Sequence, residues 1–252
     1  MNAENLAQCR WPDLAPRYAT SLRAAVGFVF ENFEPQAVIA TGSIIRGAGD
    51  RSSDLDIYVV HAAPYKQRLQ RWFGDVPAEI FVNPVPAIRE YFASEHRDGR
   101  PATAHMIASG FRVYGGEMLE ALRTEAGEWL QKPSPLTPEQ DVTARYLAAT
   151  LLEDGEDVME GDPAMASALL AEAMLAMLRY HLRARNGVIP GKKNQLSELE
   201  RSDPEAARIF RDFHAAVDLE HRLVAAHAFA DRTVRARGFF EWDSERIPVS
   251  LD

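Results

Sequence analysis

Two aspartates separated by one residue, Asp54 and Asp56, stand at the start of an apolar, β-prone segment. Alternate side chains of a strand share a face, so both carboxylates are predicted to lie on one face, about 7 Å apart along the chain. Leu55 and Ile57 are predicted to face the core instead. Two carboxylates this close repel each other unless a cation lies between them. Such oxygen ligands suit Mg²⁺, which is usually held by one or two carboxylates together with substrate phosphates.

A glycine-serine pair precedes these aspartates. A short apolar strand is predicted over 36–41, and it ends at Gly42 and Ser43, with ten residues between the pair and Asp54. Glycine lets a backbone approach a phosphate closely, and the serine hydroxyl and nearby N–H groups can donate hydrogen bonds to it. The spacing therefore predicts a phosphate-binding turn close to the two carboxylates.

A third acid, Glu79, begins another predicted strand, 79–82. If this strand lies beside the predicted strand 55–60, Glu79 joins the same carboxylate cluster. Three acids around paired metal ions would hold the attacking and leaving oxygens of an in-line displacement.

The order of these elements resembles the signature of the DNA polymerase β-like nucleotidyltransferase superfamily. The matching residues are Gly42, Ser43, Asp54, Asp56 and Glu79. The resemblance covers roughly residues 36–115. It implies that the three acids bind two Mg²⁺ ions, that the Gly-Ser turn holds the triphosphate of an NTP, and that a nucleoside monophosphate is transferred. AMP is the expected group, although the sequence does not predict which NTP is preferred. The second half resembles in layout the aminoglycoside-type (antibiotic) nucleotidyltransferases, although no specific motif matches there.

Three basic residues are further candidates for nucleotide binding. Arg46 follows the Gly-Ser pair within one turn and could reach a phosphate or the acceptor, or could simply face solvent. Lys192 and Lys193 stand at a predicted helix start, where a basic pair is unfavourable without an anionic partner such as the β- and γ-phosphates. The alternative for both lysines is an exposed loop before the helix.

An acidic run over 153–162 holds six acids and no base. One hypothesis is a pocket for a cationic acceptor, in which Glu153, Asp154 or Asp157 acts as general base for a hydroxyl. The favoured interpretation is a solvated loop between two helices, because charge runs are usually solvated.

Three prolines within 132–138 predict a domain boundary between 1–131 and 132–252. The first domain is expected to be the catalytic one, with a small mixed sheet and flanking helices. The second is expected to be an all-α bundle that closes the cleft and binds the acceptor. The fold class is therefore α+β. Beyond the strands given above, helices are predicted over 14–32, 65–73, 86–97, 102–109, 137–154, 163–186, 190–201 and 203–233.

The composition restricts the partners. The net charge is -9, and 132–252 alone carries 15 basic and 21 acidic side chains, which argues against nonspecific nucleic-acid binding. No apolar run approaches the roughly 20 residues that span a bilayer, so no membrane partner is expected. The N-terminal residues lack the pattern of a secretory signal, and a single cysteine, Cys9, fits a reducing cytoplasm.

The nature of the acceptor divides the functional hypotheses. The first is transfer to a hydroxyl of a small molecule, with an aminoglycoside-like antibiotic as one candidate. The second is protein AMPylation of the antitoxin type, and the third is a noncatalytic nucleotide-binding or interaction module. The intact set of three acids argues against the third, and the sequence makes no prediction of oligomeric state.

Overall fold

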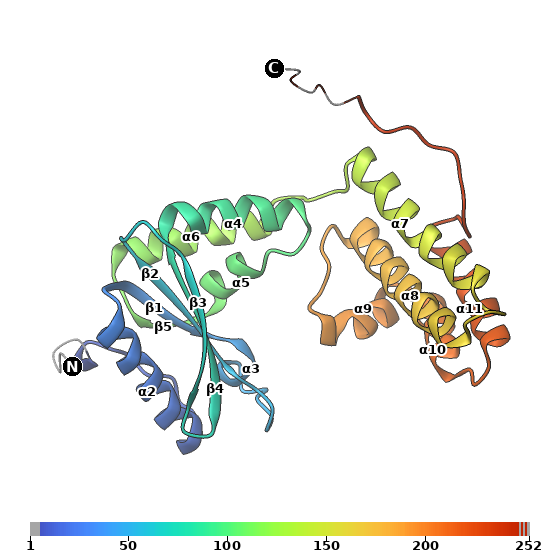
Figure 1. Cartoon of the computed structure of the whole chain (residues 1–252). Coiled ribbons are helices and arrows are strands. Elements are labelled where there is room, and N and C mark those ends of the chain that lie inside the picture. Colours follow the sequence, from blue (N-terminus) through green and yellow to red (C-terminus); the bar gives the residue numbers. More distant parts are fainter. Residues whose placement is uncertain (1–5, 247, 249, 251–252) are drawn as a thin grey trace. The chain divides into compact units, whose positions relative to one another are not determined.

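The computed structural model describes residues 6–246, 248 and 250 (Figure 1). The chain divides into two compact units, Met1–Lys132 and Pro133–Asp252. The first unit holds a five-stranded sheet flanked by helices, and the described part of the second contains helices without any strand. The predicted α+β fold class is thus confirmed.

The sheet of the first unit is mixed, and its strands follow the order β3-β4-β2-β1-β5. β2 and β4 run parallel, whereas the other neighbouring pairs are antiparallel. The strands are β1 (Pro35–Thr41), β2 (Leu55–His61), β3 (Gln67–Phe73), β4 (Val76–Pro84) and β5 (Phe111–Tyr114). The predicted strands 36–41, 55–60 and 79–82 lie within β1, β2 and β4, which form the centre of the sheet.

Helices cover both faces of this sheet (Figure 1). They are α2 (Pro16–Asn32) on one face, and α4 (Val85–Arg97), α5 (Ala102–Ser109) and α6 (Glu117–Gln131) on the other. Leu55, Ile57 and Val59 of β2 are buried on the α2 face. Tyr58 is buried on the opposite face. Because side chains alternate along a strand, Asp56 shares the face of Tyr58.

The predicted helix over 65–73 is wrong, because this segment contains the edge strand β3. Its apolar residues are spaced as in a helix, yet the whole strand pairs antiparallel with β4. A two-residue turn, Gly74 and Asp75, joins the two strands, and Gly74 has the positive φ of 65° that such hairpin turns use. The pairing with β4 therefore overrides the local pattern.

Other elements of the first unit were not predicted. These are β5, α6 and the single turn α3 (Gly42–Ile45) that follows β1. The predicted start of the third strand is also wrong, because β4 begins at Val76 and Glu79 is its fourth residue. Glu79 therefore sits inside a paired strand, where its direction is fixed on both sides by hydrogen-bonded neighbours.

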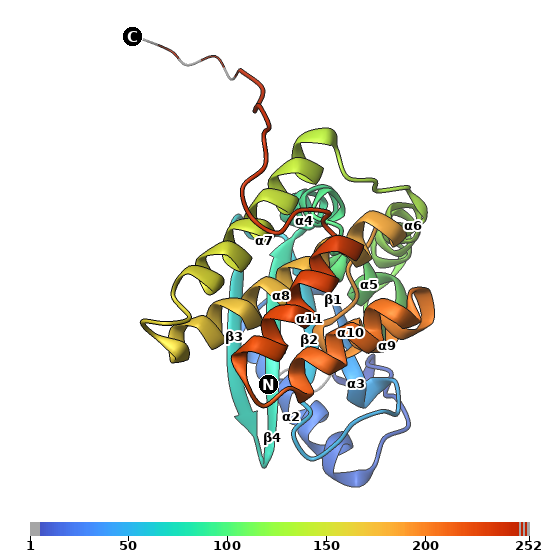
Figure 2. The same cartoon turned by 90° about the vertical axis from the view of Figure 1, so that its right-hand side faces the viewer.

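The second unit is a set of helices around one apolar core. The helices are α7 (Pro138–Asp157), α8 (Pro163–Asn186), the 3₁₀ turn η1 (Lys192–Asn194), α9 (Gln195–Ser202), α10 (Pro204–Ala215) and α11 (Leu219–Arg232). Thr137 caps α7 in a capping box, and Asp162 and Asp203 cap α8 and α10 just before a proline. α8 packs against both α7 and α11 (Figure 2).

Two boundaries in this unit differ from prediction. The helix predicted over 203–233 is broken between α10 and α11, where Asp218 caps a new helix. The acidic run is not a loop throughout, because its first five residues, 153–157, belong to α7. Gly155 lies in that turn, where an added Cβ would come within 3.0 Å of Leu170, so glycine allows α7 and α8 to approach closely. None of the helices in the described part of the chain has the length and apolar character needed to cross a membrane.

A buried aspartate links three helices of the second unit. Asp203 is 4% exposed and accepts hydrogen bonds from the Ala206 N–H at 3.1 Å and from Arg232 at 2.6 and 2.9 Å. His181 Nε2 lies 3.0 Å from the same carboxylate. Burial alone would raise the pKa of Asp203, but the bonds from Arg232 and Ala206 outweigh it and hold the pKa below its ordinary value.

This lowered pKa predicts how stability depends on pH. A carboxylate whose pKa is lower in the folded state stabilises the fold above its unfolded pKa of about 3.9, and the gain is lost as the pH falls through the folded pKa. Asp203→Asn is expected to cost about 3 kcal/mol near pH 7 and to flatten the loss of stability below about pH 5. Thermal unfolding of the full chain from neutral to acidic pH measures both effects. Asp231→Asn, which breaks an exposed ion pair with Arg237, should cost under about 1 kcal/mol.

Candidate metal centre

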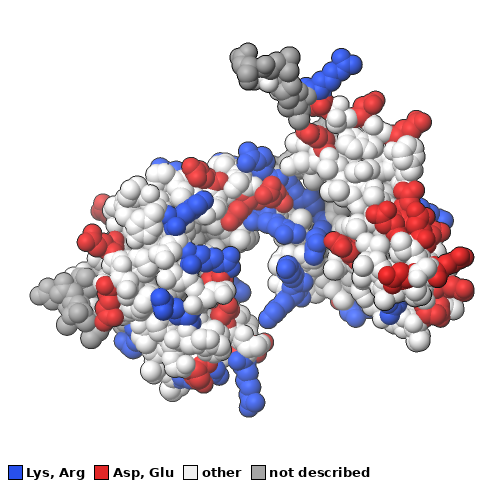
Figure 3. Space-filling model, viewed as in Figure 1, with Lys and Arg blue, Asp and Glu red and all other residues white. Residues whose placement is uncertain are grey.

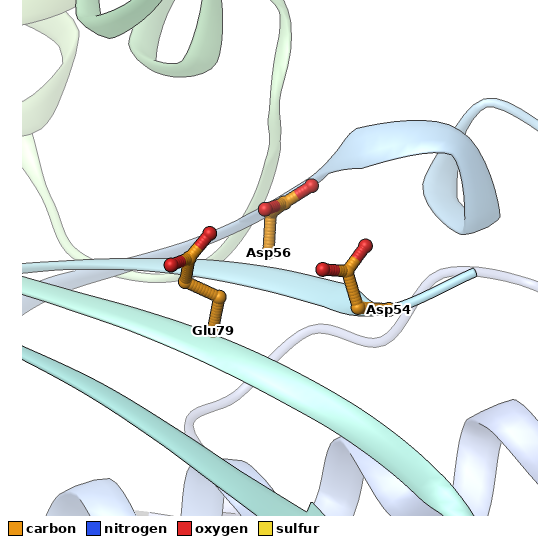
Figure 4. Close-up of side chains that lie close together, drawn as sticks. All are labelled: Asp54, Asp56 and Glu79. Atoms are coloured by element: carbon orange, nitrogen blue, oxygen red, sulfur yellow. The ribbon is translucent and has the colours of Figure 1, made fainter. Parts of the chain in front are cut away.

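Asp54, Asp56 and Glu79 converge on the first unit's sheet (Figure 4). Asp56 and Glu79 are direct register partners on the parallel strands β2 and β4, and Asp54 immediately precedes β2. One carboxylate oxygen from each residue lies within 4.8 Å of the other two. Asp54 is exposed, whereas Asp56 and Glu79 are half-buried. The arrangement brings three negative charges into one small space at the rim of the sheet.

The electrostatics of the cluster are dominated by Asp56. Burial, reinforced by the negative charges of Asp54 and Glu79, raises the pKa of Asp56 to about 6. The guanidinium groups of Arg46 and Arg68 act in the opposite direction but do not cancel the rise. The nearby positive charge thus does not offset the burial of Asp56 and the two neighbouring carboxylates, and a cation beside Asp56 would do so.

Glu79 is held by two side chains of the edge strand β3. Arg68 forms an ion pair with its carboxylate, and Gln70 Nε2 donates a hydrogen bond to Glu79 Oε1 at 3.3 Å. Arg68 also lies over the ring of Phe81, 5.2 Å from its centroid. These partners were not predicted, because a helix over 65–73 would not align with Glu79. The Gly74-Asp75 hairpin turn was the signal that could have revealed them.

The Gly-Ser turn lies directly against the cluster. Gly42 begins α3 with a φ of 89°, a conformation that L side chains rarely adopt. A Cβ added there would stand 2.2 Å from Asp56 Oδ2, which is far inside van der Waals contact. Glycine is therefore required at this position for two reasons. The backbone has a positive φ, and the Asp56 carboxylate leaves no room for a side chain.

Ser43 is positioned by a hydrogen-bonded loop. Its hydroxyl lies 3.1 Å from that of Ser53, a buried residue that the sequence did not single out. The Asp50 carboxylate accepts hydrogen bonds from Ser53 Oγ at 2.9 Å and from the Ser52 N–H at 2.9 Å. These contacts hold the loop between α3 and β2, and with it the separation of the Gly-Ser turn from the aspartates.

The donor set fits a divalent cation. Three carboxylates offer only oxygen ligands, which Mg²⁺ and similar hard cations prefer. Burial and the charges of Asp54 and Glu79 raise the pKa of Asp56, so its ionised form is disfavoured when no cation is bound. A bound cation would remove that penalty and hold the three groups together.

The remaining predicted residues fall into two groups. Arg46 follows α3 as its C-cap and is exposed, close enough to Asp56 to affect the pKa of that carboxyl. Lys192 and Lys193 form part of η1 in the second unit, where both are exposed. They start a 3₁₀ turn rather than the α-helix, which begins at Gln195. Their contact with a nucleotide stays a prediction.

The three general-base candidates lie on α7 of the second unit. Asp154 and Asp157 are exposed, and Glu153 is half-buried. Glu156, on the same turn, lies 3.1 Å from His227 of α11. The general-base role of these three acids stays a prediction.

A cavity of about 630 Å³ opens beside the cluster on the same face of the sheet. Arg68, the partner of Glu79, lines it, so the cavity begins next to that carboxylate. Tyr58 and Phe81, two residues beyond Asp56 and Glu79 on their strands, stack with centroids 5.9 Å apart. Residues of β2, β3, β4, α4 and α5 form the rest of its wall.

The polar groups at the base of this cavity are bonded to one another. Asn83 Nδ2 donates to the Tyr58 hydroxyl at 3.1 Å. Glu95 accepts from the Thr103 N–H at 2.7 Å and from its hydroxyl at 2.8 Å. Burial raises the pKa of Glu95, and the bonds from Thr103 oppose the rise. The interior of the cavity thus combines aromatic rings with polar groups that are already satisfied.

Comparison with solved structures supports the fold described above. The chain matches no known protein-family model and no curated protein. In structure it is similar to a nucleotidyltransferase-like protein from Exiguobacterium sibiricum 255-15, with a TM-score of 0.50 and 12% sequence identity. The match covers 85% of this chain and 73% of that one. At this identity the likeness concerns the fold. The chain therefore has a nucleotidyltransferase-like fold, and that fold carries a cluster of three acids suited to a divalent metal.

Proposed function

We propose that the chain is a metal-dependent nucleotidyltransferase that transfers a nucleoside monophosphate, AMP foremost, from an NTP to a hydroxyl of a small-molecule acceptor. The convergence of Asp54, Asp56 and Glu79 beside the Gly-Ser turn carries this proposal. The nucleotidyltransferase-like fold supports the same class of reaction.

Each residue of the cluster has a role in this reaction. Asp54, Asp56 and Glu79 would hold two divalent ions, and Mg²⁺ is the expected metal. The ions would neutralise phosphate charge and polarise the reacting oxygens. The backbone at Gly42 allows the triphosphate to come close, and the Ser43 hydroxyl, which donates to Ser53 in this structure, would turn to donate to a phosphate oxygen. Arg46 adds a positive charge on the same side. Catalysis then rests on positioning and on charge neutralisation.

The order of the strands gives the transfer a direction. β1 leads into the Gly-Ser turn, and β4 carries Glu79, and these two strands lie on opposite sides of β2. In an in-line displacement, the attacking and leaving oxygens lie on opposite sides of the phosphorus. With the triphosphate at the Gly-Ser turn, pyrophosphate leaves on the β1 side. The acceptor hydroxyl then approaches from the β4 side, where the cavity opens.

The properties of the cavity favour a particular kind of acceptor. Its volume of about 630 Å³ is within the range of small-molecule sites, which supports a small molecule over a protein acceptor. Phe81 and Tyr91 offer partly exposed aromatic surface, with Tyr58 buried in the wall, whereas Lys66 and Arg68 are the exposed charges at its rim. This combination favours a neutral or anionic compound with a ring. A polycationic aminoglycoside suits this cavity less well, because the exposed charges at its rim are positive.

Filling the cavity is expected to weaken acceptor binding without affecting the nucleotide. Ala102 is exposed at the first turn of α5 and lines the cavity, so Ala102→Phe places a ring inside it. We expect the acceptor KM to rise at least about tenfold, with the nucleotide KM unchanged. Ala93→Phe, an exposed position on α4 outside the cavity, is the matched control and should behave as wild type. An unchanged acceptor KM in Ala102→Phe would show that the acceptor does not bind in this cavity.

The proposed function is tested by labelled NTPs with pyrophosphate release as the readout. The purified chain is incubated with Mg²⁺, each of ATP, GTP, CTP and UTP, and three acceptor sets: aminoglycosides, neutral or anionic ring hydroxyl compounds, and protein. Transfer to a small molecule supports the proposal, and transfer to protein identifies an AMPylating enzyme. Absence of pyrophosphate release with every set would leave the noncatalytic module as the better description.

A further inference from the structure

The second unit contains a polar pocket that no residue role given above explains. It has a volume of about 580 Å³ and lies where α7, α8 and the end of α11 meet. Its charged lining residues are Arg145, Arg185, Arg232, Arg235, Asp141 and Asp203. Lys and Arg side chains gather on one side of this unit and Asp and Glu on another (Figure 3). The pocket is thus an arginine-rich place in a unit whose overall charge is negative.

The carboxylates of the pocket do not balance its guanidinium groups. Asp203 is engaged by Arg232 through two nitrogens, at 2.6 and 2.9 Å. Arg185 and Asp203 form a loose ion pair at 3.9 Å, and so do Arg145 and Asp141 at 3.9 Å. Four arginines thus face two carboxylates, and burial lowers the pKa of the neighbouring His181, although Asp203 opposes this. The pocket keeps an excess of positive charge.

Three of these arginines are held in place, two by backbone carbonyls and one by a carboxylate. Arg145 Nε donates to the Val234 carbonyl at 2.7 Å, and Arg185 donates to the Ser202 carbonyl at 2.9 Å. Arg232 is fixed by Asp203. Guanidinium groups that are already positioned lose little entropy when they bind an anion, which favours tight recognition.

Arg235 adds a strained backbone to the site. Within the residues that the structure describes, it is the only non-glycine with a positive φ, 58°. This conformation is unfavourable for an L-residue, and such strain concentrates at binding and catalytic sites. Its main-chain N–H donates to the Ala230 carbonyl at 2.8 Å, which fixes the turn, while its exposed side chain forms none of the ion pairs found among the described residues. The turn presents a free guanidinium to the pocket.

We propose that this pocket binds the phosphate groups of an anionic ligand. Arginine pairs with phosphate oxygens through two parallel hydrogen bonds, and several fixed guanidinium groups around one cavity suit an oligophosphate. The pocket is a hollow lined by three helices in a net-negative unit, which fits a compact ligand and not an extended nucleic acid. The inference does not depend on the metal cluster of the first unit.

Calorimetry on the full chain in EDTA tests the proposal, with phosphate, pyrophosphate and ATP as separate probes. EDTA removes divalent ions, so the carboxylate cluster cannot take up phosphate through a metal. We expect pyrophosphate to bind wild type, and Arg235→Gly and Arg185→Gln to raise its Kd at least about tenfold. Arg235→Gly keeps a residue suited to the positive φ, so the turn is preserved. Arg237→Gln, two residues away in an exposed ion pair, is the matched control and should bind normally.

The probes also distinguish the source of the phosphate. ATP that binds at least about tenfold more tightly than pyrophosphate, with the same dependence on Arg235 and Arg185, identifies a nucleotide as the ligand. Equal or tighter binding of pyrophosphate or phosphate identifies a free phosphate compound. The proposal is overturned if none of the three probes binds, or if both arginine variants bind them as wild type does.

Discussion

Asp56→Asn is expected to abolish nucleotidyl transfer while making the metal-free protein more stable. The activity should fall at least about a hundredfold, because a lost metal ligand exceeds the 10–100-fold typical of residues that only support ligands. Stability should change in the opposite direction. The pKa of Asp56 is raised from 3.8 to about 6, so at pH 7.5 the folded state holds an ionised carboxylate that it disfavours. Allowing for partial exposure, removing that charge is worth about 1–3 kcal/mol.

The measurement combines turnover with thermal unfolding in EDTA and in Mg²⁺. The unfolding temperature of wild type should rise when Mg²⁺ is added. Asp56→Asn should unfold at a higher temperature than wild type in EDTA, and Mg²⁺ should raise its unfolding temperature little. Asp98→Asn removes one exposed carboxylate from the same unit and should leave both properties unchanged. Asp54→Asn is expected to lose transfer as well, without unfolding the protein. Near-normal turnover in either cluster variant would show that the metal assignment is wrong.

Gly42→Ala is expected to disable the site through a single methyl group. The new Cβ would lie 2.2 Å from Asp56 Oδ2, so the carboxylate has to move away from Asp54 and Glu79. Placing alanine at a φ of 89° adds a cost of about 1 kcal/mol. We expect transfer to fall about a hundredfold, because displacements near 1 Å in a reacting site have effects of this size.

Gly47→Ala separates these two causes. Gly47 also has a positive φ, 75°, but an added Cβ would meet no atom within 4 Å. The control therefore carries the backbone cost without the contact with Asp56. Both variants should lose the stability that the backbone conformation costs, Gly42→Ala should lose more because of the added contact, and Gly42→Ala alone should lose transfer and Mg²⁺-dependent stabilisation. Equal activity in the two variants would mean that the close contact with Asp56 has no role.

Much of the sheet could be predicted from sequence because its central strands are locally consistent. β1, β2 and the second half of β4 are apolar runs bounded by turn residues, and the alternation around Asp56 fixes which face it takes. The capping residues Thr137, Asp162 and Asp203 likewise marked true helix starts, because each satisfies free N–H groups by itself.

Elements stabilised by distant partners could not be predicted in the same way. β3 is an exposed edge strand whose pattern resembles a helix, and only pairing with β4 makes it a strand. The break between α10 and α11 depends on how these helices pack together, although Asp218 offered a cap. In the site itself, the three acids and the glycine could be predicted from their spacing in the sequence. Arg68 and Gln70 were not, because their position follows from β3.

The in-register pairing of Asp56 with Glu79 has a consequence for the folding of this protein. β4 buries Ala78, Ile80 and Val82 on the face opposite Glu79. If β4 slipped by one residue against β2, Glu79 would turn to the wrong side, but those apolar side chains would also leave the core. A chain misaligned in this way would be marginally stable as well as inactive. The correct register of β4 is therefore needed both for a stable fold and for an intact site. A stable but inactive form with a shifted strand should not accumulate.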